Sequence, residues 1–299
     1  MLGCRPVATA WPGTALRIAW SFALKRFPPA EPIPVRFDGG RSRILADIRT
    51  AFGRQLYRFR GASPDLEFVR SALGPGDVFI DGGAHVGMFT LVAARAVGPS
   101  GAVYAFEPNP LSFAMLRRNV ELNEFRNVCT FAEALGEDSG SAEFAAMPGD
   151  EAPWSHLGPP RAGVEANTIT VRVTTLTERV PEEVWRRVRL VKLDLEGAEH
   201  AALLGAEPLL RQARPDLLVE YVAEHQAQAG TDPAALPALM RAWGYALLTP
   251  TRHPCLWRDL DGNPGSVLSP GRPNLLATMR PERYCTPRLR APGSGATAR

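Results

Sequence analysis

Two short apolar runs in this chain each end in an acidic residue, and a glycine-rich turn lies between them. The first run, 78–80, ends at Asp81, and the second, 103–106, ends at Glu107. The turn at 82–87 leads into a helical pattern, so the order of elements is that of a βαβ unit in a parallel sheet. Glycines let the backbone approach a ligand, and an acid after the second strand can accept hydrogen bonds from both hydroxyls of a ribose. The unit therefore predicts a site for a cofactor that carries a nucleoside.

The spacing of the glycines separates two classes of cofactor. A dinucleotide fingerprint needs a glycine at the third position of the turn, which here is Ala84. An acid, Asp81, precedes the turn, and a carboxylate suits the ammonium group of S-adenosylmethionine better than it suits a pyrophosphate. We therefore expect S-adenosylmethionine, with Asp81 at its amino end, Gly83 and Gly87 in the cofactor turn and Glu107 on its ribose. A nicotinamide-dependent oxidoreductase and a non-catalytic protein of the same fold stay open as alternatives.

A second group of charged residues lies in and after the apolar run at 190–195, which we expect to be another strand. Lys192, Asp194 and Glu196 alternate with apolar residues, and buried charges are costly unless they are paired or used. Ligands of open α/β sheets bind beyond the carboxyl ends of the strands, so we expect Asp194 and Glu196 to be catalytic. The alternative is that Glu196 caps the next helix and Lys192 pairs with Asp194. Glu220 closes the following strand, where it faces the same side of the sheet or hydrogen-bonds to loop backbone.

Strand and helix patterns alternate from residue 61 to residue 285, which predicts a doubly wound α/β domain. Most strands should be parallel, and the last apolar run, 275–279, should be an antiparallel strand. Residues 138–170 interrupt the alternation, and a loop of that length is usually functional or disordered. We expect it to be a substrate loop in which Trp154 and His156 cover the acceptor. The polar, glycine-rich segment 286–299 is expected to be a disordered tail.

Residues 1–60 are expected to form an N-terminal helix, a proline-rich linker and short strands. The helix should be amphipathic, because its apolar residues recur at helical spacing and leave a narrow polar stripe. We expect its apolar face to pack on its own domain or on a second subunit, as in a homodimer, and peripheral membrane contact is the alternative. The apolar residues are Leu16, Ala19, Trp20, Ala23 and Phe27, and the polar stripe is Arg17, Ser21 and Lys25.

Composition excludes several classes of partner. The 299 residues carry a net charge of +3 without a basic block, so we expect no nucleic acid. The four cysteines lack the spacing of a zinc site, which indicates a reducing compartment and a cytoplasmic protein. No apolar run reaches the roughly 20 residues that a transmembrane helix needs.

Five sequence blocks together resemble the FkbM-type S-adenosylmethionine-dependent methyltransferases. They are GDVFIDGGAHVGMFTL, VYAFEPNPLSFAMLRRNVELN, EALG at 133–136, VKLDLEGAEHAALLGA and LLVEY, within about residues 60–225. The resemblance implies a Rossmann-like sheet of the methyltransferase type and methylation of a hydroxyl group on a sugar, glycolipid or secondary metabolite. It also implies that Glu133 meets the adenine and that His85, where the family most often has Asn, belongs to the cofactor turn. An exchange tolerated in the turn is the alternative for His85.

Methyl transfer to an alcohol requires that its proton be removed, by a general base or with the help of a divalent metal. Asp194 and Glu196 suit either role, because carboxylate oxygens also bind Mg²⁺. Two carboxylates do not make a metal site, so a metal is compatible with the sequence but not expected. The acceptor should be a small molecule or a glycan.

Overall fold

The computed structural model describes residues 13–147, 155–160, 166–251, 253, 257–260 and 273–285. Trp154 of the expected substrate loop and the expected tail at 286–299 lie outside these ranges. All elements and contacts below belong to the described residues.

The central sheet of the described chain has eight strands: β3 (Val78–Gly82), β4 (Ala102–Phe106), β5 (Val128–Phe131), β10 (Val188–Leu193), β11 (Asp216–Glu220), β12 (Ala246–Pro250), β13 (Trp257–Asp259) and β14 (Asn274–Thr278). Their order is β13-β12-β14-β11-β10-β3-β4-β5, and the five strands from β11 to β5 are parallel. Strand β14 runs antiparallel between β11 and β12. The predicted mostly parallel sheet with an antiparallel C-terminal strand is confirmed, whereas β13 was not predicted.

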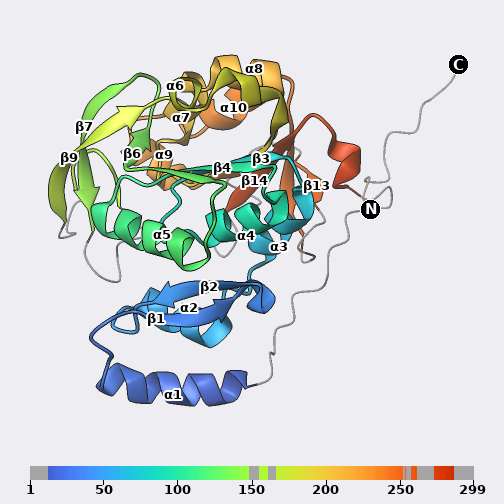
Figure 1. Cartoon of the computed structure of the whole chain (residues 1–299). Coiled ribbons are helices and arrows are strands. Elements are labelled where there is room, and N and C mark those ends of the chain that lie inside the picture. The colour runs from blue at the N-terminus through green and yellow to red at the C-terminus, as the bar shows by residue number, and fades with distance from the viewer. Residues whose placement is uncertain are drawn as a thin grey trace, which may run out of the picture.

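Helices cover both faces of this sheet (Figure 1): α3 (Pro64–Ala72), α4 (Met88–Val97) and α5 (Pro110–Leu122) lie below it, and α6 (Leu176–Arg179), α7 (Glu199–Gly205), α8 (Glu207–Ala213) and α10 (Ala235–Ala242) lie above it. Successive residues of β3 face the two layers in turn. Phe79 packs in one core with Phe68 of α3, and Ile80 packs in the other with Leu203 of α7. A central strand of this kind is apolar on both faces because helices bury both.

The position of β3 explains where a ligand can bind. The chain passes from β3 outward through β4 to β5, and the later strands β10 and β11 add to its other side. This reversal makes the junction of β3 and β10 a topological switch point, and ligands of open α/β sheets bind at the carboxyl ends of the strands there. Asp81 pairs with Lys192 in the register of these two strands, so the two predicted groups of charged residues meet at this junction.

The helix expected after β10 is two helices. Helix α7 ends at Gly205 and α8 begins at Glu207, with Pro208 in its first turn. Proline lacks the N–H that would continue the preceding helix and is favoured at a helix start. A side chain at Gly205 would also lie 2.2 Å from the Gly136 carbonyl oxygen. Both features break the pattern that periodicity alone predicts as continuous.

The expectation of a single long loop at 138–170 is wrong. Strands β7 (Gly140–Ala146), β8 (His156–Leu157) and β9 (Asn167–Thr174) join β6 (Glu133–Leu135) in a second sheet of order β6-β9-β7-β8. Alternate residues of β9, Val171 and Val173, pack with Phe144 on one buried face. The small residues of β7 have low strand propensity, so pairing with β9 rather than local preference makes β7 a strand. The role of this segment toward a substrate stays a prediction.

The N-terminal segment docks on the domain through a hairpin and the helix that follows it. Strands β1 (Ile33–Phe37) and β2 (Ser42–Ala46) pair antiparallel, as the prediction of short strands requires. Helix α2 (Ala51–Phe59) was not predicted, and its N-cap Thr50 accepts a hydrogen bond from the Gly53 N–H. Strand β2 is fixed to α5 because the Leu45 N–H donates to Asn119 Oδ1 at 2.8 Å.

Helix α1 (Thr14–Arg26) packs on α2 through its polar side, opposite to the expectation. Arg17 Nε donates to the Arg58 carbonyl at 3.2 Å, and Arg58 Nε donates to Ser21 Oγ at 2.7 Å. The prediction that the apolar face packs on its own domain is therefore wrong, because α2 meets α1 with hydrogen-bonding groups. Contact with a second subunit or a membrane stays a prediction. The exposed large apolar residues of the described part of this segment are Leu16, Trp20, Phe22, Phe27 and Phe59.

Over the described ranges, no helix has both the length and the apolar character needed to span a bilayer.

Candidate active site

A cavity of about 320 Å³ opens at the carboxyl ends of the parallel strands. Six of the eight residues predicted for the site line it: Gly83, His85, Glu107, Glu133, Asp194 and Glu196. Asp81 and Gly87 do not line the cavity and lie behind its wall. The structure thus brings the acids that follow β4 and β10 into one space with the glycine turn.

Glu107 connects the end of β4 to the glycine turn. Its carboxylate accepts the backbone N–H of His85 at 2.7 Å and that of Asn109 at 2.9 Å. Burial raises the pKa of Glu107 to about 7, although the two backbone donors lower it. A carboxylate offers about four acceptor positions, so two remain after these bonds for hydroxyl groups of a ligand.

His85 occupies a left-handed backbone conformation, with φ of 51°. Asn and His are enriched among the non-glycine residues that adopt such angles, which is a physical reason for the exchange of one for the other in this turn. The ring packs edge-on against Phe52 with centroids 4.8 Å apart. Burial and the neighbouring Lys192 lower the pKa of His85 to about 4. The imidazole is therefore neutral at physiological pH and is a weak base.

Gly83 is required by its neighbours as well as by its conformation. Its φ is +71°, and a Cβ there would lie 1.9 Å from the Asp194 carbonyl oxygen. The turn after β3 and the turn after β10 thus touch through backbone atoms. Gly87 begins α4 with φ of +95°, and a Cβ there would lie 2.7 Å from Leu116 Cδ1.

Lys192 connects, through its side chain, backbone and acidic groups at the base of the cavity. It is 3% exposed, and Nζ donates to the carbonyls of Gly83 at 2.7 Å and Gly82 at 3.1 Å. The same ammonium lies 3.4 Å from Asp81 Oδ1 and 3.5 Å from Asp194 Oδ2. Burial lowers the pKa of Lys192, but the carboxylates of Asp194 and Asp81 outweigh it, and the pKa lies above its usual value. The pairing of Lys192 with Asp194 considered from the sequence is present, and Asp81 shares it.

Asp81 is fully buried, and its Oδ2 accepts a hydrogen bond from Thr90 Oγ1 at 2.6 Å. Burial raises the pKa of Asp81, while Lys192 lowers it. In the structure this acid contacts the protein interior and not the cavity.

Three acidic residues follow β10, namely Asp194, Glu196 and Glu199, and each has different neighbours. The strand ends at Leu193, two residues earlier than predicted, so Asp194 is in the turn, with a side chain 39% exposed. The alternative that Glu196 caps α7 is wrong. The N-cap residue of α7 is Ala198, and no side chain caps the helix there. Glu199, the first residue of α7, folds back on the preceding turn, where its carboxylate accepts the N–H of Leu195 at 2.6 Å and that of Gly197 at 3.1 Å.

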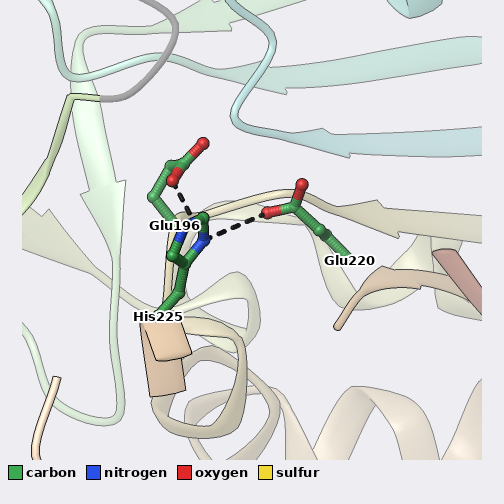
Figure 2. A group of neighbouring side chains, drawn as sticks. All are labelled: Glu196, Glu220 and His225. Atoms are coloured by element: carbon green, nitrogen blue, oxygen red, sulfur yellow. Dashed lines mark ion pairs between the residues drawn. The ribbon is translucent and has the colours of Figure 1, made fainter. Parts of the chain in front are cut away.

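Glu196 instead points toward two residues of the next strand–helix unit (Figure 2). Glu220, at the end of β11, lines the cavity with it, and His225 lies on the short helix α9 (Ala223–Gln228). His225 Nδ1 is 3.1 Å from Glu196 Oε2 and 3.9 Å from Glu220 Oε2. Burial and the neighbouring Asp194 raise the pKa of Glu220 to about 9. His225 was not predicted, because a histidine five residues beyond a strand end carries no signal until β10 and β11 are known to be neighbours.

With this geometry in place, the sequence match decides the family. Residues 81–247, more than half of the chain, match the Methyltransferase FkbM domain. The chain belongs to the FkbM methyltransferase family. Members of this family depend on S-adenosylmethionine, and most of the residues that line the cavity belong to the sequence blocks that carry the likeness.

This FkbM-family methyltransferase aligns with most of the length of two curated relatives. "Methyltransferase 1" of Beauveria bassiana is 30% identical over 58% of this chain and 74% of that protein. "31-O-demethyl-FK506 methyltransferase FkbM" of Streptomyces tacrolimicus is 28% identical over 54% of this chain and 73% of that protein.

A solved structure, Methyltransferase FkbM from Methylobacillus flagellatus KT, is 14% identical and covers 88% of this chain. This chain spans 58% of that protein, less than two thirds of its length, with a TM-score of 0.43. The superposition adds nothing to the family assignment, which rests on sequence.

Glu133 of this FkbM-family protein is already bound on both carboxylate oxygens. Arg179 forms a two-pronged contact with it, at 2.6 Å and 2.5 Å, and Arg172 Nε lies 3.4 Å away. The predicted contact of Glu133 with an adenine stays a prediction, and the acid has a structural role in joining β6 to α6.

Part of the cavity wall of this methyltransferase was not predicted from the sequence. Phe52 comes from the N-terminal segment, Phe144 and Leu157 come from the second sheet, and Ser155 directly precedes β8. A further cavity of about 370 Å³ lies between the N-terminal segment and α5 and shares Phe52 and His85 with the first. No local pattern marks these residues, because they reach the site only through tertiary packing.

Proposed function

We propose that this FkbM-family methyltransferase transfers a methyl group from S-adenosylmethionine to a hydroxyl group of a small-molecule or glycan acceptor. The observation that carries the proposal is the cavity itself. It places the glycine turn, the half-satisfied Glu107 carboxylate and the Asp194 carboxylate around one space at the switch point of the sheet. The relative named 31-O-demethyl-FK506 methyltransferase supports oxygen as the acceptor atom.

The residues present fit the cofactor. The cavity has the size of a small-molecule site, and Glu107 retains acceptor positions for the two ribose hydroxyls. The turn at Gly83 and His85 forms the adjoining wall. Asp81, being buried behind that wall, would act by holding Lys192 against the turn carbonyls and not by touching the cofactor. Bound S-adenosylmethionine supplies a methyl group already activated by a sulfonium.

The chain's own residues then have to orient the acceptor and take its proton. Asp194 is the candidate for both, because its side chain lines the cavity and remains 39% exposed. Lys192 lies beside Oδ2 and Glu220 also hydrogen-bonds to this carboxylate, whose exposed part is available to accept the acceptor's O–H. His85 is unsuited to this role because its pKa is about 4. Glu196 also lines the cavity and is the second candidate.

We place the acceptor at the side of the site where the two cavities share Phe52 and His85. The aromatic ring of Phe52 offers an apolar surface there, and the wall behind it belongs to the N-terminal segment. Acceptor choice in this arrangement depends on residues outside the glycine turn, in segments of the kind that vary between functions built on one fold.

The direct test is a mass-spectrometric screen of hydroxylated sugars, glycolipids and polyketides with S-adenosylmethionine carrying a deuterated methyl group. The proposal expects a labelled methyl on an acceptor oxygen with the wild-type protein and labelling at least about a hundredfold slower with Asp194→Asn. Label found on nitrogen or carbon would contradict the hydroxyl specificity, and equal labelling by the Asp194→Asn variant would contradict its role.

A further inference from the structure

Three side chains from three successive parts of the fold converge beside the cavity (Figure 2). Glu196 lies in the turn after β10, Glu220 ends β11, and His225 lies in α9. One carboxylate oxygen from each glutamate and one ring nitrogen of the histidine all lie within 4.8 Å of one another. The three side chains are 9%, 16% and 20% exposed, so the group is largely withdrawn from bulk water.

The histidine nitrogen in this group is not satisfied by the protein. Nδ1 of His225 is buried and makes no hydrogen bond to any described residue, although it lies 3.1 Å from Glu196 Oε2. The contact with Glu196 therefore lacks hydrogen-bond geometry. A buried polar nitrogen without a partner is costly and calls for an explanation such as a bound ion.

The donors match the ligand set of a transition-metal ion. Carboxylate oxygens and imidazole nitrogens are both ligands of divalent ions of the first transition row, and catalytic sites use three protein ligands and leave a position open for water or substrate. Ligand atoms 2.0–2.2 Å from a common ion lie about 3–3.5 Å apart. The distance of 3.1 Å between His225 Nδ1 and Glu196 Oε2 already lies in this range. Glu220 Oε2, at 3.9 Å from the same nitrogen, needs only a small side-chain rotation to reach it.

We propose that Glu196, Glu220 and His225 bind one divalent cation of the first transition row, such as Mn²⁺ or Zn²⁺, at the edge of the cavity. The local balance of charge favours a cation there. Lys192 forms its ion pairs with Asp81 and Asp194, and among the described residues no lysine or arginine forms an ion pair with Glu220.

The site differs from the expectation drawn from sequence, in which Asp194 and Glu196 alone did not suffice for a metal. The structure replaces Asp194 with Glu220 and adds a nitrogen ligand. Because Glu196 and Glu220 line the cavity, open coordination positions of the ion would face the acceptor. A hydroxyl bound there becomes more acidic and is held for transfer; this last step rests on the proposed function, whereas cation binding does not.

The test is a titration of chelator-treated full-length protein with MnCl₂, followed by electron paramagnetic resonance of free Mn²⁺. Manganese is the probe because the cysteine thiols compete for zinc. The proposal expects one Mn²⁺ per chain, with affinity reduced at least tenfold by His225→Gln and by Glu220→Gln. The matched control is His200→Gln, a histidine on α7 outside the cluster, which should bind as the wild type does.

Binding of S-adenosylhomocysteine reports separately whether each variant is folded, and it should be unchanged in His225→Gln. If a variant does not fold, spin-echo spectra of Mn²⁺ on the wild-type protein decide the question, because the site requires a coordinated imidazole nitrogen. Absence of stoichiometric Mn²⁺, equal binding by both cluster variants, or a bound ion without a nitrogen ligand would overturn the site. Mn²⁺ bound by the three residues without methyl transfer to any hydroxyl would uphold the site and count against the proposed function.

Discussion

The carboxylate of Glu107 accepts the backbone N–H of His85 at 2.7 Å, so the acid that ends β4 also fixes the glycine turn that follows β3. A residue expected only to bind ribose thus helps to shape the wall of the cavity. The link also explains why the turn tolerates a left-handed residue at position 85, since its N–H must point at the acid.

Cofactor affinity should depend on pH through Glu107. Burial raises its pKa to about 7 in the cofactor-free protein, and only the ionised form can accept hydrogen bonds from both ribose hydroxyls. Affinity for S-adenosylhomocysteine should rise as pH increases through about 7 and then level off, with proton release on binding below that value. Calorimetry in two buffers of different ionisation enthalpy measures both quantities. Affinity that is independent of pH would contradict the assignment, and Glu107→Gln should show that flat profile.

The raised pKa of Glu107 also makes the stability of the folded state depend on pH. The folded state holds a proton on Glu107 that the unfolded state releases near pH 4.5. Stability from this group is therefore complete below about pH 4.5 and is lost as pH rises to about 7.

Lys192→Met should destabilise the fold by about 3–5 kcal/mol, because it leaves the fully buried Asp81 without its cation. Adding Asp81→Asn to Lys192→Met should restore part of the loss, since the uncompensated charge is then removed. Urea unfolding measures the loss of stability in Lys192→Met and its partial recovery in the double variant. The control is Lys25→Met, the only other lysine in the chain, at the end of α1. Equal unfolding midpoints for Lys192→Met and Lys25→Met would show that the buried ion pair does not stabilise the domain.

Asp194→Asn should lower the rate of methyl transfer about a hundredfold to ten-thousandfold, which is the usual contribution of a general base. Affinity for S-adenosylhomocysteine should change little, because Asp194 contacts Lys192 and the acceptor side of the cavity. The measurement is single-turnover transfer to the acceptor found in the screen. A loss confined to cofactor affinity would assign Asp194 to cofactor binding instead.

Gly83→Ala should destabilise the protein by more than about 1 kcal/mol, because its φ of +71° disfavours any side chain. The added Cβ would also meet the Asp194 carbonyl at 1.9 Å, so the turn after β10 must shift. Gly140→Ala in β7 is the control, since nothing lies within 4 Å of a Cβ there. Thermal unfolding compares the two, and similar midpoints would show that the turns do not constrain each other.

The sheet could be predicted from sequence where burial acts on both faces of a strand. The apolar runs of β3 and β4 are bounded by glycines or acids, and the ends of β3, β4 and β5 were placed to within a residue. The second sheet could not, because β7 is rich in alanine and serine and becomes a strand only beside β9. Helix α1 was oriented wrongly because periodicity shows which face is apolar but not what its neighbour offers.

The candidate site likewise contains residues that the sequence predicts and residues that only tertiary packing brings there. Acids at strand ends were found from their positions, since the carboxyl ends of parallel strands share one edge. Glu196 was considered as the cap of α7, whereas no side chain caps that helix and Glu199 accepts N–H groups of the turn before it. Sequence spacing does not reveal which of two acids three residues apart folds back on the turn. His225 and Phe52 come from segments whose distance from the cavity depends on tertiary packing alone.

The central claim is that the cavity around Glu107 binds S-adenosylmethionine. It is tested most directly by calorimetric titration of the purified protein with S-adenosylmethionine, S-adenosylhomocysteine and NADH, in parallel with Glu107→Ala and the exposed control Glu121→Ala on α5. The account predicts binding of the first two ligands, a loss of at least tenfold in Glu107→Ala, no change in Glu121→Ala and no binding of NADH. Binding of NADH alone, or S-adenosylmethionine binding that is indifferent to Glu107, would contradict it.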